Sequence, residues 1–248
     1  MYRKHFALSA FPFDLTPQPE DLFVSSTLTE AEVRLQHLLE LRAIGLVTGE
    51  AGSGKTTVCR KVAAALHPGL YRVFYVPLST GNVMDMYKSI GWELGLPTER
   101  NRAAAFRVIR AEITRLTLEA KQRPVLIVDE AHHLRNEVLE DLRLLTNHVM
   151  DSEDRFSIIL SGSNTFPARL RQPQNSTLAQ RITYSYGLKG MNLNEAKDYI
   201  RFHLQRADGQ PDLFHPSAVQ LLFQHSRGYP RVINQLASHA LIQATVKK

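Results

Sequence analysis

Eight consecutive residues, Gly49 to Thr56, read Gly-Glu-Ala-Gly-Ser-Gly-Lys-Thr and fit the pattern G-x-x-x-x-G-K-[ST]. Glycines let such a loop curl so that its backbone N–H groups point at phosphate oxygens, and a helix N-terminus adds partial positive charge. Lys55 is placed to reach β- and γ-phosphates, and the Thr56 hydroxyl to complete a Mg²⁺ shell. A chance glycine-rich turn is the alternative. The predicted nucleotide-binding residues are Gly49, Glu50, Ala51, Gly52, Ser53, Gly54, Lys55, Thr56 and Thr57.

An acidic pair, Asp129-Glu130, directly follows the apolar run 125–128. A carboxylate at the carboxyl end of a buried strand lies where ligands of an open α/β sheet bind. Asp129 is expected to hold Mg²⁺, and Glu130 to orient or deprotonate the attacking water. Taken alone, the two acids are also typical of a helix N-cap. Together with the phosphate loop, they predict Mg²⁺-dependent hydrolysis of ATP.

The same segment, Asp129 to His132, also spells the Asp-Glu-Ala-His tetrad of helicases. A helicase of that type needs two tandem ATPase lobes, whereas these 248 residues contain one phosphate loop. This excludes the helicase interpretation. His132 and His133 are interpreted as polar neighbours of the acidic pair, because no third metal ligand is spaced to join them.

Strand and helix patterns alternate around these motifs, which predicts an α/β fold with a parallel sheet and helices on both faces. A capping box, Thr27-x-x-Glu30, marks the start of the first long helix. Three last helical patterns without a strand between them predict a helical lid. We expect a nucleotide-binding core with an N-terminal arm over 1–190 and the lid over 191–248. The expected strands are 44–48, 71–76, 125–128, 156–160 and 182–188, and the expected helices are 55–66, 82–94, 103–121, 136–149, 165–181, 193–206, 215–226 and 230–246.

Composition places the chain among globular proteins: 44% of its residues are hydrophobic and 22% are charged. No stretch approaches the ~18 apolar residues of a membrane span, and Pro12 and Asp14 interrupt the apolar start, so no signal peptide is expected. The single cysteine, Cys59, excludes an intrachain disulfide and a multi-cysteine zinc site. These features favour a cytoplasmic protein.

The net charge of +6 is unevenly distributed. Residues 100–123 carry seven basic and two acidic side chains, whereas residues 124–165 carry three basic and eight acidic ones. Segregated positive charge is typical of a protein that binds a polyanion. A solvated helix face is the alternative for the basic segment. The residues considered for contact with the DNA backbone are Arg100, Arg102, Arg107 and Arg110.

The order of the motifs resembles the AAA+ ATPases, and within them the group that contains the ExeA-type secretion ATPases and the TniB and TnsC transposition ATPases. The resemblance covers nearly the whole chain and implies a P-loop AAA+ core with a small C-terminal helical lid. The motifs that carry it are Phe11-Pro12-Phe13, Thr16-Pro17, Gly49–Thr57, Asp129-Glu130-Ala131, Leu160-Ser161-Gly162-Ser163, Leu178-Ala179-Gln180-Arg181-Ile182 and Gly228-Tyr229-Pro230-Arg231-Val232-Ile233-Asn234.

The resemblance implies roles for three polar residues outside the loop. Ser163 matches the sensor-1 position, although relatives often have Asn, Gln or Thr there, so Asn164 or Ser161 are alternatives. Arg231 matches sensor 2, at a helix start that Pro230 favours.

Arg181 matches an arginine finger that reaches the nucleotide of the next subunit, where a guanidinium neutralises charge on the transferred phosphoryl group. Arg169 and Arg171 are competitors for this role, and a surface arginine is the alternative.

The function implied is an ATPase that self-assembles into a ring or helical oligomer on duplex DNA and regulates target selection for a transposase or adaptor partner. The ATPase domain of an ExeA-like secretion or pilus-assembly protein is the alternative. Full-length ExeA-like proteins continue into a membrane span, whereas this sequence ends at Lys248, so we expect the transposition role. The intact Lys55, Asp129 and Glu130 argue against a nucleotide switch without catalysis.

Overall fold

The computed structural model describes residues 2–13, 21–77 and 82–246, and the chain divides into two compact units, each with its own hydrophobic core. Thr16 and Pro17 of the family signature lie outside the described residues. The sheet unit comprises Ala31–Gly49 and Lys55–Gly187. The terminal unit comprises Met1–Glu30, Glu50–Gly54 and Leu188–Lys248.

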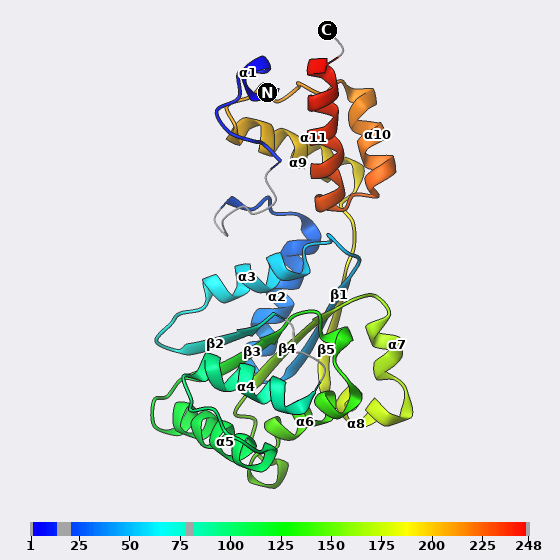
Figure 1. The fold of residues 1–248 in the computed structure, drawn as a ribbon. Helices are drawn as coiled ribbons and strands as arrows, with labels where there is room; N and C mark the ends of the chain where they lie inside the picture. Colours follow the sequence, from blue (N-terminus) through cyan, green and yellow to red (C-terminus); the bar gives the residue numbers. More distant parts are fainter. Residues whose placement is uncertain (1, 14–20, 78–81, 247–248) are drawn as a thin grey trace. The chain divides into compact units, whose positions relative to one another are not determined.

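A five-stranded parallel sheet with the strand order β2-β3-β4-β1-β5 forms the centre of the sheet unit (Figure 1). Val47 pairs with Ser161, and Val128 pairs with Leu160, so β1, β3 and β4 end at nearly the same level. The predicted α/β fold is confirmed. The strands are β1 (Ile44–Gly49), β2 (Tyr71–Val76), β3 (Arg123–Val128), β4 (Ser157–Gly162) and β5 (Ile182–Leu188).

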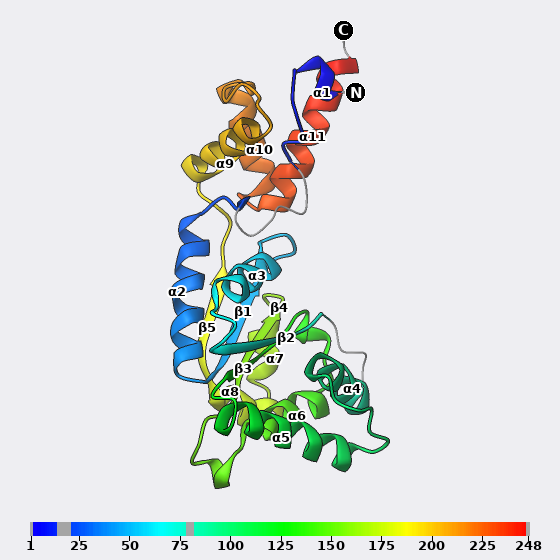
Figure 2. The same ribbon diagram turned by 90° about the vertical axis from the view of Figure 1, so that its left-hand side faces the viewer.

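Helices cover both faces of this sheet (Figure 2). Successive strand side chains point to opposite faces, and Leu46, Leu126 and Leu160 all join the cluster that includes α4, α5 and α6. On the other face, a Cβ on Gly45 would lie 2.5 Å from a methyl carbon of Leu38, so α2 packs directly on β1. The flanking helices are α2 (Ser26–Glu40), α3 (Lys55–Ala65), α4 (Val83–Leu94), α5 (Arg102–Leu118), α6 (Asn136–Thr146), α7 (Phe166–Leu170) and α8 (Ser176–Arg181).

Two local predictions are wrong. The helix expected over 165–181 is broken into α7 and α8, because Gln172 is extended (φ −65°, ψ 147°) ahead of Pro173, as residues before proline usually are. The predicted capping box does not form either. Helix α2 already begins at Ser26, and the N–H of Leu28 donates to Oγ of Ser25 at 3.3 Å.

Within the described residues, the terminal unit contains four whole helices and the first residues of α2. Asn192 and Glu195 form a reciprocal capping box at the start of α9. Within the described ranges, no helix combines the length and the apolar character that crossing a membrane requires. The helices are α1 (Tyr2–His5), α9 (Leu193–Arg206), α10 (Pro216–Ser226) and α11 (Pro230–Val246).

The N-terminal arm groups with the C-terminal helices and not with the sheet, where the expected domain division had placed it. The reason is hydrophobic burial. Tyr2, Leu8 and Phe13 are buried in the same cluster as Ile200 and Leu204 of α9. The aromatic residues of the arm therefore pack within the terminal unit.

Acid is expected to destabilise the terminal unit through His203, which is 3% exposed. Burial, and then the charge of Arg206, lowers its pKa from 6.5 to about 4. The unfolded chain therefore takes up the proton first, and stability present above pH 6.5 is lost as the pH falls towards 4, by about 3 kcal/mol at most. The free energy of unfolding, measured with urea across this pH range, should depend less steeply on pH in His203→Gln than in the wild type. The same substitution at the exposed His225 should leave the pH dependence unchanged, and equal slopes in all three proteins would contradict the prediction.

Candidate functional site

The predicted phosphate loop connects β1 to α3. Gly52 (φ 81°) and Gly54 (φ 97°) adopt the left-handed backbone conformations that glycine tolerates best. Helix α3 begins at Lys55, whose buried Nζ donates to the carbonyl of Gly49 at 3.0 Å. Oγ of Ser53 is buried without a hydrogen-bond partner among the described residues. A helix N-terminus, a buried ammonium group and an unpaired hydroxyl fit an anionic phosphate chain.

The carboxylate of Asp129 accepts hydrogen bonds from residues near the ends of several elements. It is 4% exposed and immediately follows β3. Its Oδ2 accepts a hydrogen bond from Oγ1 of Thr56 at 2.6 Å, and its Oδ1 accepts one from Oγ of Ser161 at 2.6 Å. The N–H of Glu130 donates to Oδ1 at 2.9 Å. The hydroxyl and the carboxylate expected to share Mg²⁺ are thus brought together from sites 73 residues apart.

Tyr75 is a site residue that the sequence did not indicate. Its hydroxyl lies 3.2 Å from Oδ2 of Asp129 and donates to it. Burial, followed by the charge of Asp129, raises the pKa of Tyr75 to about 12, so the phenol keeps its proton. The same two causes raise the pKa of the buried Cys59 thiol to about 12. The sequence placed Tyr75 near the end of a predicted strand, which is a possible position for a site residue. It did not show that β2 lies next to β3, and that neighbourhood is what brings Tyr75 to Asp129.

Glu130 lies in a turn that directs its side chain towards solvent. Its backbone is left-handed (φ 50°), its side chain is 45% exposed, and it makes no cap hydrogen bond. Oε2 of Glu130 lies 3.5 Å from Nδ1 of His132, which accepts the N–H of Ser163 at 3.3 Å. Burial, and then His133, lowers the pKa of His132, so at neutral pH its ring is uncharged.

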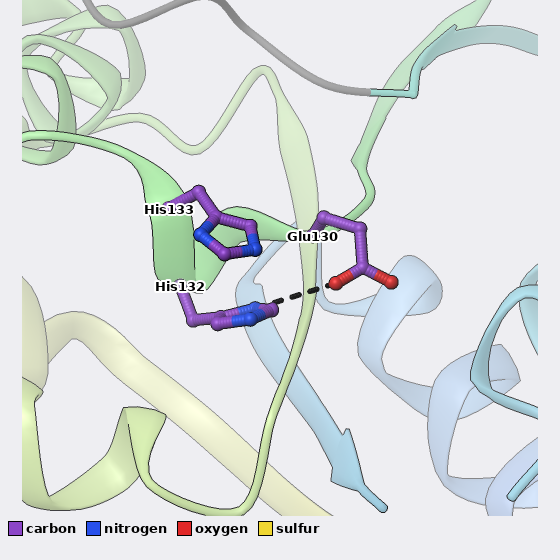
Figure 3. Close-up of side chains that lie close together, drawn as sticks. All are labelled: Glu130, His132 and His133. Carbon is purple, nitrogen blue, oxygen red and sulfur yellow. Dashed lines mark ion pairs between the residues drawn. The ribbon is translucent and has the colours of Figure 1, made fainter. Parts of the chain in front are cut away.

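The expectation that no third ligand joins the two histidines is wrong. Ligand atoms of Glu130, His132 and His133 all lie within 4.8 Å of one another (Figure 3). The spacing of these residues along the chain did not indicate the cluster. It forms through the left-handed turn at Glu130, a backbone conformation that glutamate rarely adopts.

The polar residues at the end of β4 and just after it differ in exposure and in hydrogen bonding. Ser161 is fully buried and donates to Asp129. Ser163 is half-buried, and its Oγ lies 2.8 Å from Oγ1 of Thr165, while Asn164 is exposed. Ser163 and Asn164 therefore remain candidates for sensing the nucleotide, and Ser161 positions Asp129.

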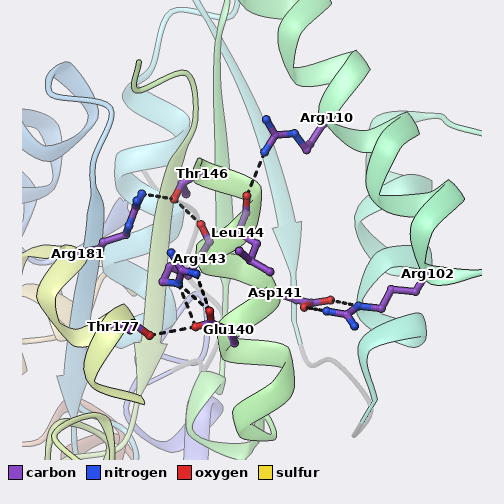
Figure 4. A network of polar contacts seen from close by, with 9 residues as sticks. All are labelled: Arg102, Arg110, Glu140, Asp141, Arg143, Leu144, Thr146, Thr177 and Arg181. Atoms are coloured by element: carbon purple, nitrogen blue, oxygen red, sulfur yellow. Dashed lines mark hydrogen bonds and ion pairs between the residues drawn. The ribbon is translucent and has the colours of Figure 1, made fainter. Parts of the chain in front are cut away.

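The three arginines considered for the finger have different environments. Arg169 donates to the carbonyls of His132 and Leu134 and to Oδ1 of Asn136, so it fastens the turn after β3. Arg171 is exposed. Arg181 is half-buried, and its Nη1 lies 3.2 Å from Oγ1 of Thr146 at the end of α6 (Figure 4).

Within the terminal unit, Arg231 lies against the phosphate loop. Its N–H lies 3.4 Å from the carbonyl of Gly52, and a Cβ on Gly52 would meet Cβ of Arg231 at 2.6 Å. A side chain on Gly52 is therefore excluded both by its positive φ and by this close approach.

Two arginines of the basic segment are engaged with α6 (Figure 4). Nε of Arg102 donates to Oδ2 of the buried Asp141 at 2.8 Å, and the hydroxyl of Tyr87 donates to the same oxygen at 2.7 Å. Arg110 donates to the carbonyls of Leu144 and Asn147, which lie at the end of α6. Both guanidinium groups hold α5 against α6.

Other charges of this segment are also paired. Arg115 forms an ion pair with Glu112 at 2.7 Å, and Arg123 lies over the ring of Tyr71. Of the four arginines proposed for DNA contact, Arg100, Arg102 and Arg107 are exposed, but only the guanidinium groups of Arg100 and Arg107 make no hydrogen bond or ion pair within the described part of the chain.

Residues 38–170 match a family model described as an AAA domain (AAA_22). This is more than half of the chain and includes the phosphate loop, Asp129 and Glu130. The chain belongs to this AAA domain family. Its predicted resemblance to the AAA+ ATPases of the ExeA, TniB and TnsC group is confirmed.

The chain is similar to curated proteins of two kinds. It is 37% identical over 247 residues to general secretion pathway protein A of Aeromonas hydrophila, covering 98% of this chain and 45% of that protein. It is 27% identical over 149 residues to the ATP-dependent target DNA activator B of Escherichia phage Mu, covering 60% of this chain and 44% of that protein. The chain thus spans less than half the length of these relatives.

Solved structures confirm the fold of the AAA domain. Cdc6p of Pyrobaculum aerophilum superimposes with a TM-score of 0.72 at 15% identity, covering 95% of this chain and 66% of that one. The Aeropyrum pernix ORC1 protein, solved in complex with DNA, gives a TM-score of 0.67 at 17% identity, covering 96% and 64%.

Removing the Ser161 hydroxyl is expected to lower the free energy of unfolding of the sheet unit by about 1–2 kcal/mol, because the buried Asp129 loses a donor. Urea unfolding of Ser161→Ala measures this change. Ser163→Ala is the matched control, since that hydroxyl makes an exposed contact with Thr165, and its effect should stay within about 0.5 kcal/mol. Equal effects of the two substitutions would contradict the assigned role of Ser161.

Proposed function

We propose that this AAA domain binds ATP with Mg²⁺ and hydrolyses it. The observation that supports this most directly is the 2.6 Å contact between Oγ1 of Thr56 and Oδ2 of Asp129. Hydroxyl and carboxylate oxygens are the ligands that Mg²⁺ prefers, so these residues fit the ion. When bound, Mg²⁺ neutralises charge on the phosphates.

Lys55 and the loop hold the phosphates in this proposal. The Lys55 ammonium is within 3.0 Å of the Gly49 carbonyl and can exchange that acceptor for phosphate oxygens. The unpaired hydroxyl of Ser53 is a further donor. Arg231, whose N–H lies 3.4 Å from the carbonyl of Gly52, is proposed as a further positive charge beside the loop.

Glu130 orients the attacking water and accepts its proton. Its carboxylate is partly exposed, and the uncharged His132 does not neutralise it. Ser163 or Asn164 is placed after β4 to contact the water or the γ-phosphate, because strand ends of a parallel sheet gather on one edge.

Arg181 is proposed to act on a neighbouring subunit, which makes hydrolysis depend on self-assembly into a ring or helical oligomer. Its contact with Thr146 lies at the end of α6, whereas Thr56 and Asp129 meet at the strand ends. A guanidinium group from a second copy stabilises the charge on the transferred phosphoryl group.

For the biological role, we propose ATP-driven action in a general secretion pathway, on the cytoplasmic side where ATP is available. The support is the 37% identity to general secretion pathway protein A across 98% of the chain. The structure also weakens the charge argument for DNA, because Arg102, Arg110, Arg115 and Arg123 are engaged within the chain.

Assembly on duplex DNA and target selection for a transposase is the second candidate. It is supported by the 27% identity to the phage Mu target DNA activator and by the exposed Arg100 and Arg107. Such contacts to phosphates would be salt-dependent and largely independent of sequence.

Glu130→Gln is expected to retain ATP binding and to lower turnover by about 10²–10⁴-fold, because the amide cannot accept the proton of the attacking water. Binding of a fluorescent ATP analogue and phosphate release measure the two properties separately. Full turnover in this variant would contradict the role of Glu130.

Mixing the Glu130→Gln and Arg181→Ala variants tests whether Arg181 acts as an arginine finger on a neighbouring subunit. Each variant alone should be inactive, but a mixed oligomer contains interfaces that pair an intact Glu130 with an intact Arg181. Partial recovery of phosphate release is expected. No recovery, in mixtures shown to co-assemble, would contradict action between subunits.

Duplex DNA is expected to bind weakly and without dependence on ATP if the secretion role is correct. Fluorescence anisotropy over a salt series, with and without a non-hydrolysable ATP analogue, measures this, and affinities within about threefold of each other are expected at each salt concentration. Tight, ATP-dependent binding that Arg100→Ala and Arg107→Ala remove, and that Arg171→Ala at another exposed position does not, would instead establish the second candidate.

A further inference from the structure

Three side chains of types that commonly bind transition metals lie close together beside the proposed magnesium site. Glu130, His132 and His133 offer one carboxylate oxygen and two imidazole nitrogens, all within 4.8 Å of one another (Figure 3). Oε2 of Glu130 lies 3.5 Å from Nδ1 of His132. Two ligands bonded to Zn²⁺ at about 2.0–2.1 Å lie a little over 3 Å apart in tetrahedral geometry, so small side-chain rotations close the set.

The backbone holds these ligands on one turn. The left-handed Glu130 is followed by the buried Ala131 and by the 3-10 turn η2 (Ala131–His133). Arg169 donates to the carbonyl of His132 at 2.8 Å and fastens the turn from outside. The imidazole rings stack with centroids 4.0 Å apart.

The ligands are accessible from solvent. The Glu130 side chain is 45% exposed, and His133 is exposed, with an imidazole that makes no hydrogen bond or ion pair within the described residues. A metal ion can therefore enter without the chain unfolding, and a fourth position remains open for water.

We propose that Glu130, His132 and His133 form a binding site for a transition-metal dication of the Zn²⁺, Co²⁺ or Ni²⁺ class. Imidazole nitrogen favours these ions over Mg²⁺, which prefers oxygen ligands such as those of Thr56 and Asp129. The two sites therefore select different ions although Asp129 and Glu130 are adjacent.

Occupation of this site inhibits ATP hydrolysis, an inference that rests on the proposed role of Glu130. A carboxylate bonded to a metal ion cannot accept the proton of the attacking water. Zinc would thus act as an inhibitor of turnover that leaves Lys55 and Thr56 free for the nucleotide.

Titration of the whole chain with CoCl₂, without nucleotide or Mg²⁺, tests the site directly. Imidazole-bound Co²⁺ in a site of low coordination number gives visible absorption far stronger than that of hydrated Co²⁺. We expect saturation at one equivalent and displacement by ZnCl₂. His133→Ala should weaken binding by at least about tenfold, whereas His225→Ala, which removes another exposed imidazole, should not.

Absorption that is absent, or that survives His133→Ala unchanged, would overturn the proposal. Asp129→Asn separates the two metal sites, and a cobalt signal lost with this variant but kept in His133→Ala would place the ion on the magnesium ligands instead. Zinc should also inhibit phosphate release by wild type and spare His133→Ala. A chain without any ATPase activity would contradict the proposed function, while the cobalt titration would still decide the metal site.

Discussion

The buried carboxylate of Asp129 is the interaction on which the arrangement of the site depends. A charge with 4% exposure is costly unless it is hydrogen-bonded, and this carboxylate accepts bonds from Thr56, Tyr75, Ser161 and the N–H of Glu130. The three hydroxyls come from α3, β2 and β4. Satisfying this one charge therefore fixes the ends of these elements around the end of β3, and it specifies their register as well as their chemistry.

The conformation of Glu130 follows from the same constraint. Its N–H points back to Asp129, and the chain must then turn away from the sheet, which it does through a left-handed residue. This turn exposes the Glu130 carboxylate and carries His132 and His133 to the same side. The turn that exposes the carboxylate proposed to activate water thus also brings Glu130, His132 and His133, the proposed metal ligands, together.

Features encoded by short segments were predictable from the sequence, whereas features that depend on strand order or long-range packing were not. The loop from Gly49 to Thr56 and the strand before Asp129 are local patterns, and the structure contains both elements. Tyr75 reaches Asp129 only because β2 adjoins β3, and periodicity does not specify strand order. The N-terminal arm groups with α9 because its aromatic residues find apolar partners some 190 residues away, a contact that composition cannot place. The break at Pro173 is a local signal that the apolar pattern of 165–181 obscured.

Charge counts along a sequence overstate the charge available for a polyanion, and residues 100–123 show why. A guanidinium group can hold a neighbouring helix as effectively as it can hold a phosphate, because its fork of donors matches carbonyl and carboxylate oxygens equally well. Arg102 donates to the buried Asp141, and Arg110 donates to the carbonyls of Leu144 and Asn147 at the end of α6. Moving either arginine to a ligand would remove hydrogen bonds from these acceptors, and a lost hydrogen bond costs about 0.5–1.5 kcal/mol, or about 1.5–3 kcal/mol when it involves a charged group. Of the four arginines considered for DNA contact, Arg100 and Arg107 are therefore the two whose guanidinium groups are exposed without an engaged partner in the described chain, whereas Arg102 and Arg110 help to hold α5 against α6.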